Sequence, residues 1–416
     1  MKKMKLPLWL KNILLLLSVL GPGLITASAD NDAPGIATYS MVGSTYGYNF
    51  LWLILVITVG EVVILEMVAR MGAVTGKGTA DLIREKFGVK ITTFAMFCLL
   101  MANLGTTVAE FAGVAAAGEL FGINKVITVP IMAVIMGLFI LRSNYKIIEK
   151  ILIGLSLAAL SYVATVFIIK PDWGVILHDT LRPQIQLTSD YIVSILAVIG
   201  TTITPWAIFY LQASVADKGV SMENYRDTKL DVTVGSAWGN VISAFIIIVT
   251  ATTLFKVGIR VEDAKDAAMA LAPLAGEAST ILFALGLLGA SLLAVSVLPL
   301  STTYAVCEAF GFERGLNRSF RDAPVFYGSF IGIIVFSVLI VLIPGMPLFQ
   351  MMILSQSLNA ILLPVILILV LRLANDKVVM GKYRNTRLTN ILAVAITTLI
   401  VAVTVILLLE PLLNIV

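Results

Sequence analysis

Four short stretches of this chain place acids, amides and hydroxyls inside segments that are otherwise apolar. The first stretch, SADNDAPGIATY at 28–39, carries Asp30, Asn31 and Asp32 beside a proline and a glycine. Ionisable groups are costly where such a segment crosses a membrane, and there they usually mark a functional site. The other three stretches contribute Asn103, Thr107 and Glu110, then Thr201, Thr202, Thr204 and Gln212, and finally Ser355, Gln356 and Asn359.

The donor atoms of this set indicate the ligand that it favours. No Lys, Arg or His lies among these residues, and the only histidine of the chain, His178, falls in a predicted loop. Acids, amides and hydroxyls without a basic partner attract a cation, and hard oxygen donors favour Mg²⁺, Ca²⁺ or Mn²⁺ over Cu⁺ or Zn²⁺. An organic cation is the alternative, for which Trp206 and Tyr210 are the available aromatic groups.

The composition shows what kind of element must position these side chains. The 416 residues are 59% hydrophobic and 13% charged, with a mean hydropathy of +0.99. Soluble domains are only about half apolar, so we expect an all-α integral membrane protein. The basic start MKKMKLPLWL runs into further apolar sequence without a small-residue cleavage site, so we expect it to be retained. Eleven membrane spans are predicted, at 12–45, 50–70, 91–120, 125–141, 147–169, 190–215, 232–257, 277–307, 325–343, 347–373 and 389–411.

The distribution of Lys and Arg predicts the orientation in the membrane. Cytoplasmic loops carry an excess of both residues. In this chain the N-terminus and the loops on its side of the predicted spans hold 23 Lys and Arg residues, whereas the loops on the other side hold 6. The N-terminus is therefore expected in the cytoplasm and the C-terminus outside, in the cell membrane. The net charge of +4 follows from this topology, so it indicates contact with anionic membrane lipids rather than with nucleic acid.

Two of the predicted spans are interrupted in matching positions. The first is broken at DNDAPGIA and the sixth at TTITPWAI, five spans later. An odd number of spans gives the two halves opposite orientations, and paired broken helices in inverted halves are typical of the substrate site of a secondary transporter. We therefore expect one transmembrane domain over 1–416, with inverted repeats at about 12–169 and 190–373 and an extra helix at 389–411.

Several longer motifs resemble one family over most of the chain. The stretches GPGLITASADNDAPGIAT, GYNFLWLILV, ARMGAVTGKGTADLIREKFG, TTVAEFAG and LSQSLNAILLPV are similar to those of the Nramp family of divalent metal transporters. This resemblance implies the leucine-transporter type of 5+5 inverted repeat, with broken helices one and six and the metal bound between them.

The chain departs from the family pattern at the positions that touch the metal. Where the family has Asp-Pro-Gly-Asn and Met-Pro-His, this sequence has Asp32-Ala33-Pro34-Gly35 and Thr204-Pro205-Trp206. Thr107 replaces an acid that the family uses for proton transfer, and the ninth span has no arginine beyond Arg321. The pattern resembles the Nramp-related magnesium transporters, because losing the thioether removes a soft ligand.

The resulting prediction is uptake of Mg²⁺, and also of Mn²⁺, by alternating access without proton coupling. Asp32 is the expected main ligand and Glu110 the second, direct or through water. The Thr201 carbonyl and Gln356 complete the shell, Gly35 and Thr204 widen it, Asp30 and Asn31 line the entrance, and Gln212 faces the site from the inner half of the sixth span.

Three other functions can be weighed against this prediction. A proton-coupled Mn²⁺/Fe²⁺ importer of the ordinary Nramp type is the alternative, and a sodium-coupled organic-solute transporter is a third reading. No Ser–His, Cys–His or metal–histidine constellation lies at membrane depth, which argues against an enzyme. The metal is thus substrate, no resident cofactor is expected, and the oligomeric state stays open.

Overall fold

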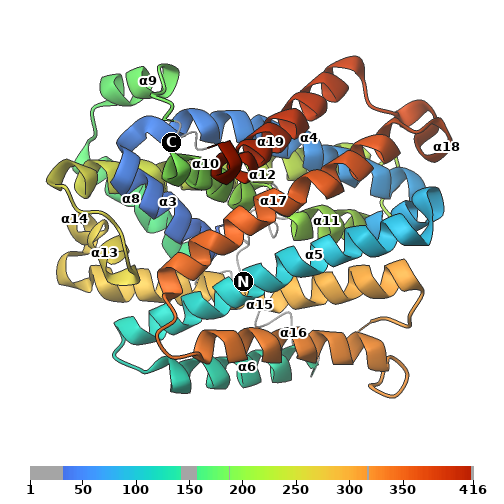
Figure 1. Cartoon of the computed structure of the whole chain (residues 1–416), viewed down its shortest axis with the longest axis horizontal. Helices are drawn as coiled ribbons and strands as arrows, with labels where there is room; N and C mark the ends of the chain where they lie inside the picture. The colour runs from blue at the N-terminus through green and yellow to red at the C-terminus, as the bar shows by residue number, and fades with distance from the viewer. Residues whose placement is uncertain (1–30, 142–156, 187, 316–317, 414–416) are drawn as a thin grey trace, which may run out of the picture.

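A computed structural model describes residues 31–141, 157–186, 188–315 and 318–413 of the chain (Figure 1). Every regular element in these ranges is helical, which confirms the all-α prediction. Asp30 and the first parts of the predicted spans 12–45 and 147–169 lie outside the described residues. The longer helices are α3 (Ala33–Tyr46), α4 (Leu51–Thr75), α5 (Thr79–Leu120), α6 (Lys125–Leu141), α8 (Leu160–Ile169), α10 (Ser189–Thr202), α11 (Pro205–Asp217), α12 (Tyr225–Thr253), α15 (Ser279–Phe310), α16 (Pro324–Leu342), α17 (Leu348–Asn375) and α19 (Arg387–Leu413).

Short helices occupy the connections. They are α9 (Trp173–Leu181), α13 (Ala264–Met269), α14 (Ala272–Ala275) and α18 (Lys377–Met380). Large apolar side chains on α6 and α16 are exposed, as with Val134 and Leu339, each 61% exposed. Such surfaces suit contact with lipid, so the chain is a multi-pass membrane protein.

The described residues contain eight helical runs that are long and apolar enough to cross a membrane, or nine with the bent pair of α8 and α9. The prediction of eleven differs for identifiable reasons. A 3₁₀ turn, Gly47–Phe50, joins α3 and α4 into one run, and α6 has a shorter apolar stretch, Lys125–Leu138. Much of the predicted span 147–169 lies outside the described residues, and its end is α8.

The sixth span is broken where the sequence predicts it. Helix α10 ends at Thr202, Ile203 and Thr204 are extended, and α11 begins at Pro205. Proline has no N–H, so the Thr201 carbonyl, four residues earlier, loses its helical partner. The first span restarts in a similar way, because α3 begins at Ala33 with Pro34 in its first turn.

Helix α5 is the central element of the bundle and runs between α15 and α17 (Figure 1). It begins at Thr79, well before the predicted start at 91, and Gly88 bends it with a φ of 77° that glycine adopts readily. Helix α12 packs against both α3 and α4. Helices α10 and α17 meet backbone to backbone, because a Cβ at Gly200 would overlap the carbonyl oxygen of Gln356.

Candidate functional site

Two buried carboxyl groups meet at the start of α3. Asp32 is 1% exposed and Glu110 on α5 is fully buried. The N–H of Gly35 donates to Asp32 Oδ1 at 2.7 Å, so Asp32 caps α3. Glu110 interacts electrostatically with Asp32, the backbone of Ala33 and Ser291. Within the described chain neither Glu110 oxygen has a partner in hydrogen-bonding geometry, so the site has donor oxygens available for a ligand.

A glycine on α5 allows this close approach. Gly113 lies one turn beyond Glu110, and a Cβ there would lie 2.5 Å from the Cβ of Ala33 and would overlap the Ser291 hydroxyl. Atoms in contact normally lie about 3.5–4.0 Å apart, so only glycine fits here without displacing α3 or α15. Gly113 thereby determines how closely Glu110 approaches Asp32.

The break between α10 and α11 adds more oxygen atoms. The hydroxyls of Thr201 and Thr204 are buried and have no hydrogen-bond partner among the residues described. The neighbouring Thr202 differs, because its hydroxyl bonds to the Val198 carbonyl at 2.8 Å and to the Tyr39 hydroxyl at 2.9 Å. Since Tyr39 belongs to α3, this bond holds the end of α10 against the second half of the first broken helix.

Helix α17 contributes a network of amide groups. Gln356 is fully buried, and its Oε1 accepts a hydrogen bond from Asn359 Nδ2 at 2.9 Å. Asn359 Nδ2 also donates to the Thr106 hydroxyl at 2.9 Å and approaches the Gly200 carbonyl at 3.5 Å. The network therefore joins α17 to α5 and to the last turn of α10. Thr106 was not singled out from the sequence, because a hydroxyl in a helix gives no signal of its own there.

Two residues expected at the entrance or facing the site direct their side chains to other partners. Asn31 donates from Nδ2 to the Gly239 carbonyl at 3.3 Å and accepts at Oδ1 from Ser243 at 3.4 Å, so its amide faces α12. Gln212 accepts from Thr79 at 2.7 Å and donates to the Lys77 carbonyl at 3.0 Å. It lies about 12 Å along α11 from the break, so it braces the linker between α4 and α5.

One methionine lies close to the carboxyl pair. Met352 is fully buried on α17, one turn before Gln356 and on the same helix face. Its sulfur would lie 3.6 Å from a Cβ at Gly113. Met352 is not among the residues expected from the sequence, because a single methionine in an apolar helix carries no distinguishing signal.

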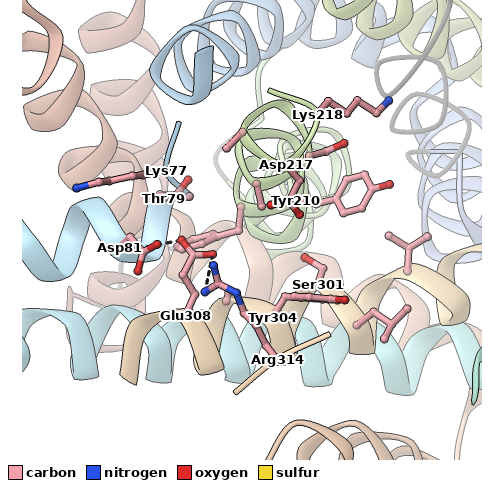
Figure 2. A pocket seen from close by; sticks show the side chains of 18 of the residues that line it. Lys77, Thr79, Asp81, Tyr210, Asp217, Lys218, Ser301, Tyr304, Glu308 and Arg314 are labelled. Carbon is pink, nitrogen blue, oxygen red and sulfur yellow. Dashed lines mark hydrogen bonds and ion pairs between the residues drawn. The ribbon is translucent and has the colours of Figure 1, made fainter. Parts of the chain in front are cut away.

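A cavity of about 370 Å³ lies beside α11, on the C-terminal side of the break. It lies between the linker of α4 and α5, helix α11 and the C-terminal half of α15. Figure 2 shows Glu308 between Asp81 and Arg314 on its wall. Glu308 accepts from the Asp81 N–H at 3.2 Å and lies 3.5 Å from Arg314. The cavity reaches Ser301, whose hydroxyl contacts the Trp206 carbonyl at 3.4 Å, just beyond the break.

A second cavity, of about 360 Å³, lies toward the other end of α5. Its lining includes Ala116 and Glu119 of α5, Glu262 and Asp263 before α13, and Phe349 of α17. In the sequence of α5, Glu110 lies between Asp81, which lines the first cavity, and Ala116, which lines the second. Such an arrangement can pass a small ligand from one side to the other by opening each cavity in turn.

Comparison with known proteins identifies relatives that match most of the chain. Residues 23–410 match the family model "Natural resistance-associated macrophage protein-like". The divalent metal cation transporter MntH of Bacillus subtilis is 29% identical over 408 residues, covering 95% of this chain and 92% of that protein. MntH of Erwinia tasmaniensis is 31% identical over 284 residues, covering 66% and 68% respectively.

Solved structures agree on the fold. The manganese transporter of Eremococcus coleocola superposes with a TM-score of 0.72 at 21% identity, covering 98% of this chain and 88% of that one. Mhp1, a nucleobase-cation-symport-1 family transporter, gives 0.56 at 15% identity, covering 94% and 91%. These likenesses confirm the predicted inverted-repeat fold of the leucine-transporter type. With the family model matching nearly its full length, the chain belongs to the Nramp family.

Proposed function

We propose that the protein is a secondary transporter that takes up divalent metal cations, Mg²⁺ and also Mn²⁺, by alternating access without proton coupling. The observation that carries the proposal is the buried pair of Asp32 and Glu110 at the start of α3, in which both Glu110 oxygens lack a hydrogen-bond partner among the described residues. Two carboxylates in a site of low dielectric repel each other strongly, and a 2+ ion between them removes that repulsion. The metal is the substrate.

The ligand set follows from the available oxygens. Asp32 and Glu110 supply the negative charge. The Thr201 carbonyl has no helical partner, because Pro205 lacks an N–H. Gln356 is linked to the same turn of α10 by Asn359, which bonds to Gln356 and approaches the Gly200 carbonyl. Mg²⁺ usually binds through one or two carboxylates and keeps several waters. The free hydroxyls of Thr201 and Thr204 suit hydrogen bonds to such waters.

The donor chemistry also bears on selectivity between metals. The break carries Thr204 where the family has a methionine, and the loss of the thioether favours hard ions such as Mg²⁺. The sulfur of Met352, which lies one turn before Gln356 on α17 and close to Gly113, is a softer group that suits Mn²⁺. We therefore place the protein with the Nramp-related magnesium transporters while expecting it to admit Mn²⁺.

The absence of proton coupling is inferred from particular positions. Position 107 holds a threonine in place of the family's acid, and its hydroxyl donates a hydrogen bond to the Asn103 carbonyl at 2.7 Å. Trp206 replaces the family histidine, and the described α16 sequence, PVFYGSFIGIIVFSVLIVL, contains no charged residue. A proton released near Glu110 therefore lacks the titratable groups that the family uses to carry it.

We place the larger cavity of Figure 2 on the cytoplasmic side, because Lys77, Lys218 and Arg314 at that end belong to the predicted inside loops. The N-terminus is then cytoplasmic and the C-terminus external. Uptake is driven by the metal gradient and by the membrane potential, which supplies about 4.6 kcal/mol per 100 mV for a 2+ ion, twice the unit-charge value.

Purified protein in liposomes tests this function. Entry of Mg²⁺ and of Mn²⁺ is followed with metal-sensitive dyes, and internal pH is followed in parallel. We expect both ions to enter the wild-type vesicles without a pH change, and neither to enter vesicles holding Asp32→Ala. Internal acidification in step with Mn²⁺ entry would instead support the ordinary proton-coupled Nramp importer, as would a failure of excess Mg²⁺ to enter or to compete.

A further inference from the structure

A further buried carboxyl group, outside the pair of Asp32 and Glu110, is linked to the proposed metal site through α12. Glu61 lies in the middle of α4, is 2% exposed, and accepts a hydrogen bond from Asn240 Nδ2 of α12 at 2.5 Å. Asn240 also donates to the carbonyl of Ser236, one turn earlier in α12. An ionisable residue at this depth is costly, so its retention calls for a role.

The same turn of α12 holds the residue that precedes Asp32. The carbonyl of Gly239, next to Asn240, accepts from Asn31 Nδ2 at 3.3 Å, and the Ser243 hydroxyl donates to Asn31 Oδ1 at 3.4 Å. Ser243 also bonds back to the Gly239 carbonyl at 3.2 Å. Both ends of the Asn31 amide are thus held by one turn of α12.

Asp32 is held from two sides as a result. On its C-terminal side the N–H of Gly35 fixes the carboxylate at 2.7 Å. On its N-terminal side the backbone is held through Asn31, and α12 packs closely along α3 beyond it, since a Cβ at Gly43 would overlap the Thr250 hydroxyl. A rotation or shift of α12 would therefore change the position of the Asp32 carboxylate.

We propose that Glu61 is a positioning residue for the metal site. By accepting the hydrogen bond from Asn240 it fixes the Gly239–Ser243 turn, that turn fixes Asn31, and Asn31 sets the backbone before Asp32. This inference rests on the proposed function and adds to it a residue that no ligand set includes. Glu61 acts here through its hydrogen bond, so a glutamine, whose Oε1 accepts the same bond, is expected to replace it.

Other charged groups between α4 and α12 form a separate cluster. Glu66, more than a turn further along α4, accepts from the Tyr225 hydroxyl at 3.0 Å and lies 3.5 Å from Arg70 and 3.9 Å from Lys229. These groups join α4 to the first turns of α12, whereas Asn240 lies in its middle. Substitutions at Glu61 therefore leave the contacts of Glu66 in place.

Binding of Mn²⁺ to the full-length protein in detergent, measured by calorimetry, tests the proposal together with Mn²⁺ uptake in liposomes. The variants are Glu61→Leu, Glu61→Gln, Asn240→Leu, the Glu61→Leu/Asn240→Leu double variant, and Ser243→Ala. Thr58→Val is the matched control, because Thr58 lies one turn before Glu61 and, among the described residues, its hydroxyl bonds to the Ile54 carbonyl of its own helix. Size-exclusion profiles confirm that each variant is folded.

We expect Glu61→Leu and Asn240→Leu each to weaken Mn²⁺ binding by about tenfold, because each leaves a buried polar group without its hydrogen-bond partner. The uptake KM rises in proportion and kcat stays the same. The double variant is no weaker than either single one, Ser243→Ala weakens binding in the same direction, and Glu61→Gln and Thr58→Val bind as the wild type does.

Two results would overturn the positioning role while leaving the proposed function standing. One is wild-type affinity in Glu61→Leu or, if that variant does not fold, in Asn240→Leu and Ser243→Ala. The other is a loss in Glu61→Gln as large as in Glu61→Leu, which would assign the role to the charge. A wild-type protein that binds no Mn²⁺ refutes the proposed function, and the positioning role with it.

Discussion

Replacing Gly113 by alanine perturbs the carboxyl pair without altering a ligand. The new Cβ would lie 2.5 Å from the Cβ of Ala33, whereas carbon atoms in contact lie about 3.5–4.0 Å apart, so α5 and α3 must separate by about 1 Å. Glu110, one turn away on α5, moves with its helix, and Ala33 is bonded to Asp32. Overpacking of this kind costs about 1–3 kcal/mol of stability.

The separation of the two helices also changes the metal site. Mg²⁺ binds oxygen at about 2.0–2.1 Å in a near-ideal octahedron, so a shift of about 1 Å prevents both carboxylates from coordinating it directly. We expect Gly113→Ala to weaken Mn²⁺ binding in calorimetry by at least about tenfold and to lower the Tm only modestly.

Gly105→Ala on the same helix is the matched control for this substitution. Its added Cβ would meet the flexible end of Leu358, at 3.3 Å, and not a second backbone. We expect this variant to bind Mn²⁺ as the wild type does. Wild-type affinity in Gly113→Ala, with the variant folded, would refute the idea that Gly113 sets the distance between the two carboxyl groups.

Three further predictions concern single side chains. Asp32→Ala should abolish binding of Mg²⁺ and Mn²⁺ in calorimetry and Glu110→Ala should weaken it, because each removes charge from a site of low dielectric; unchanged Mg²⁺ affinity in Asp32→Ala would show that another residue is the main ligand. Thr204→Met should shift competition assays toward Mn²⁺ and Cd²⁺ by adding a polarizable sulfur, and an unchanged preference would place that residue outside the metal's reach. Gln212→Leu should leave the Mn²⁺ affinity unchanged yet slow uptake, since its amide holds the α4–α5 linker through Thr79 and Lys77; a lost affinity would return it to the ligand set.

Much of the fold could be predicted because its signals are local. Pro205 removes an N–H that the helix needs, so the break at the sixth span is written into a few residues. Asp32 followed by Pro34 is likewise a helix start that can be read from the sequence. The burial of Glu110 follows from the apolar residues around it.

The sequence is less informative where a side chain has more than one possible partner. Gln212 lies on α11 as expected, but its amide pairs with Thr79 and the Lys77 carbonyl, from another part of the chain. Asn31 adjoins Asp32 in sequence, yet its amide faces α12. The role of Gly113 depends on how closely α3 and α15 approach α5, which the sequence of α5 alone does not state.

The contact between Gly200 and Gln356 has a consequence for how this site can change in evolution. Because α10 and α17 touch there through their main chains, their separation depends on position 200 having no side chain. Sequence drift on the lipid-facing sides of these helices therefore leaves the distance between them unchanged. A descendant of this protein that keeps Gly200 is expected to change its metal preference by exchanging donor atoms, as at position 204, rather than by moving the two helices apart.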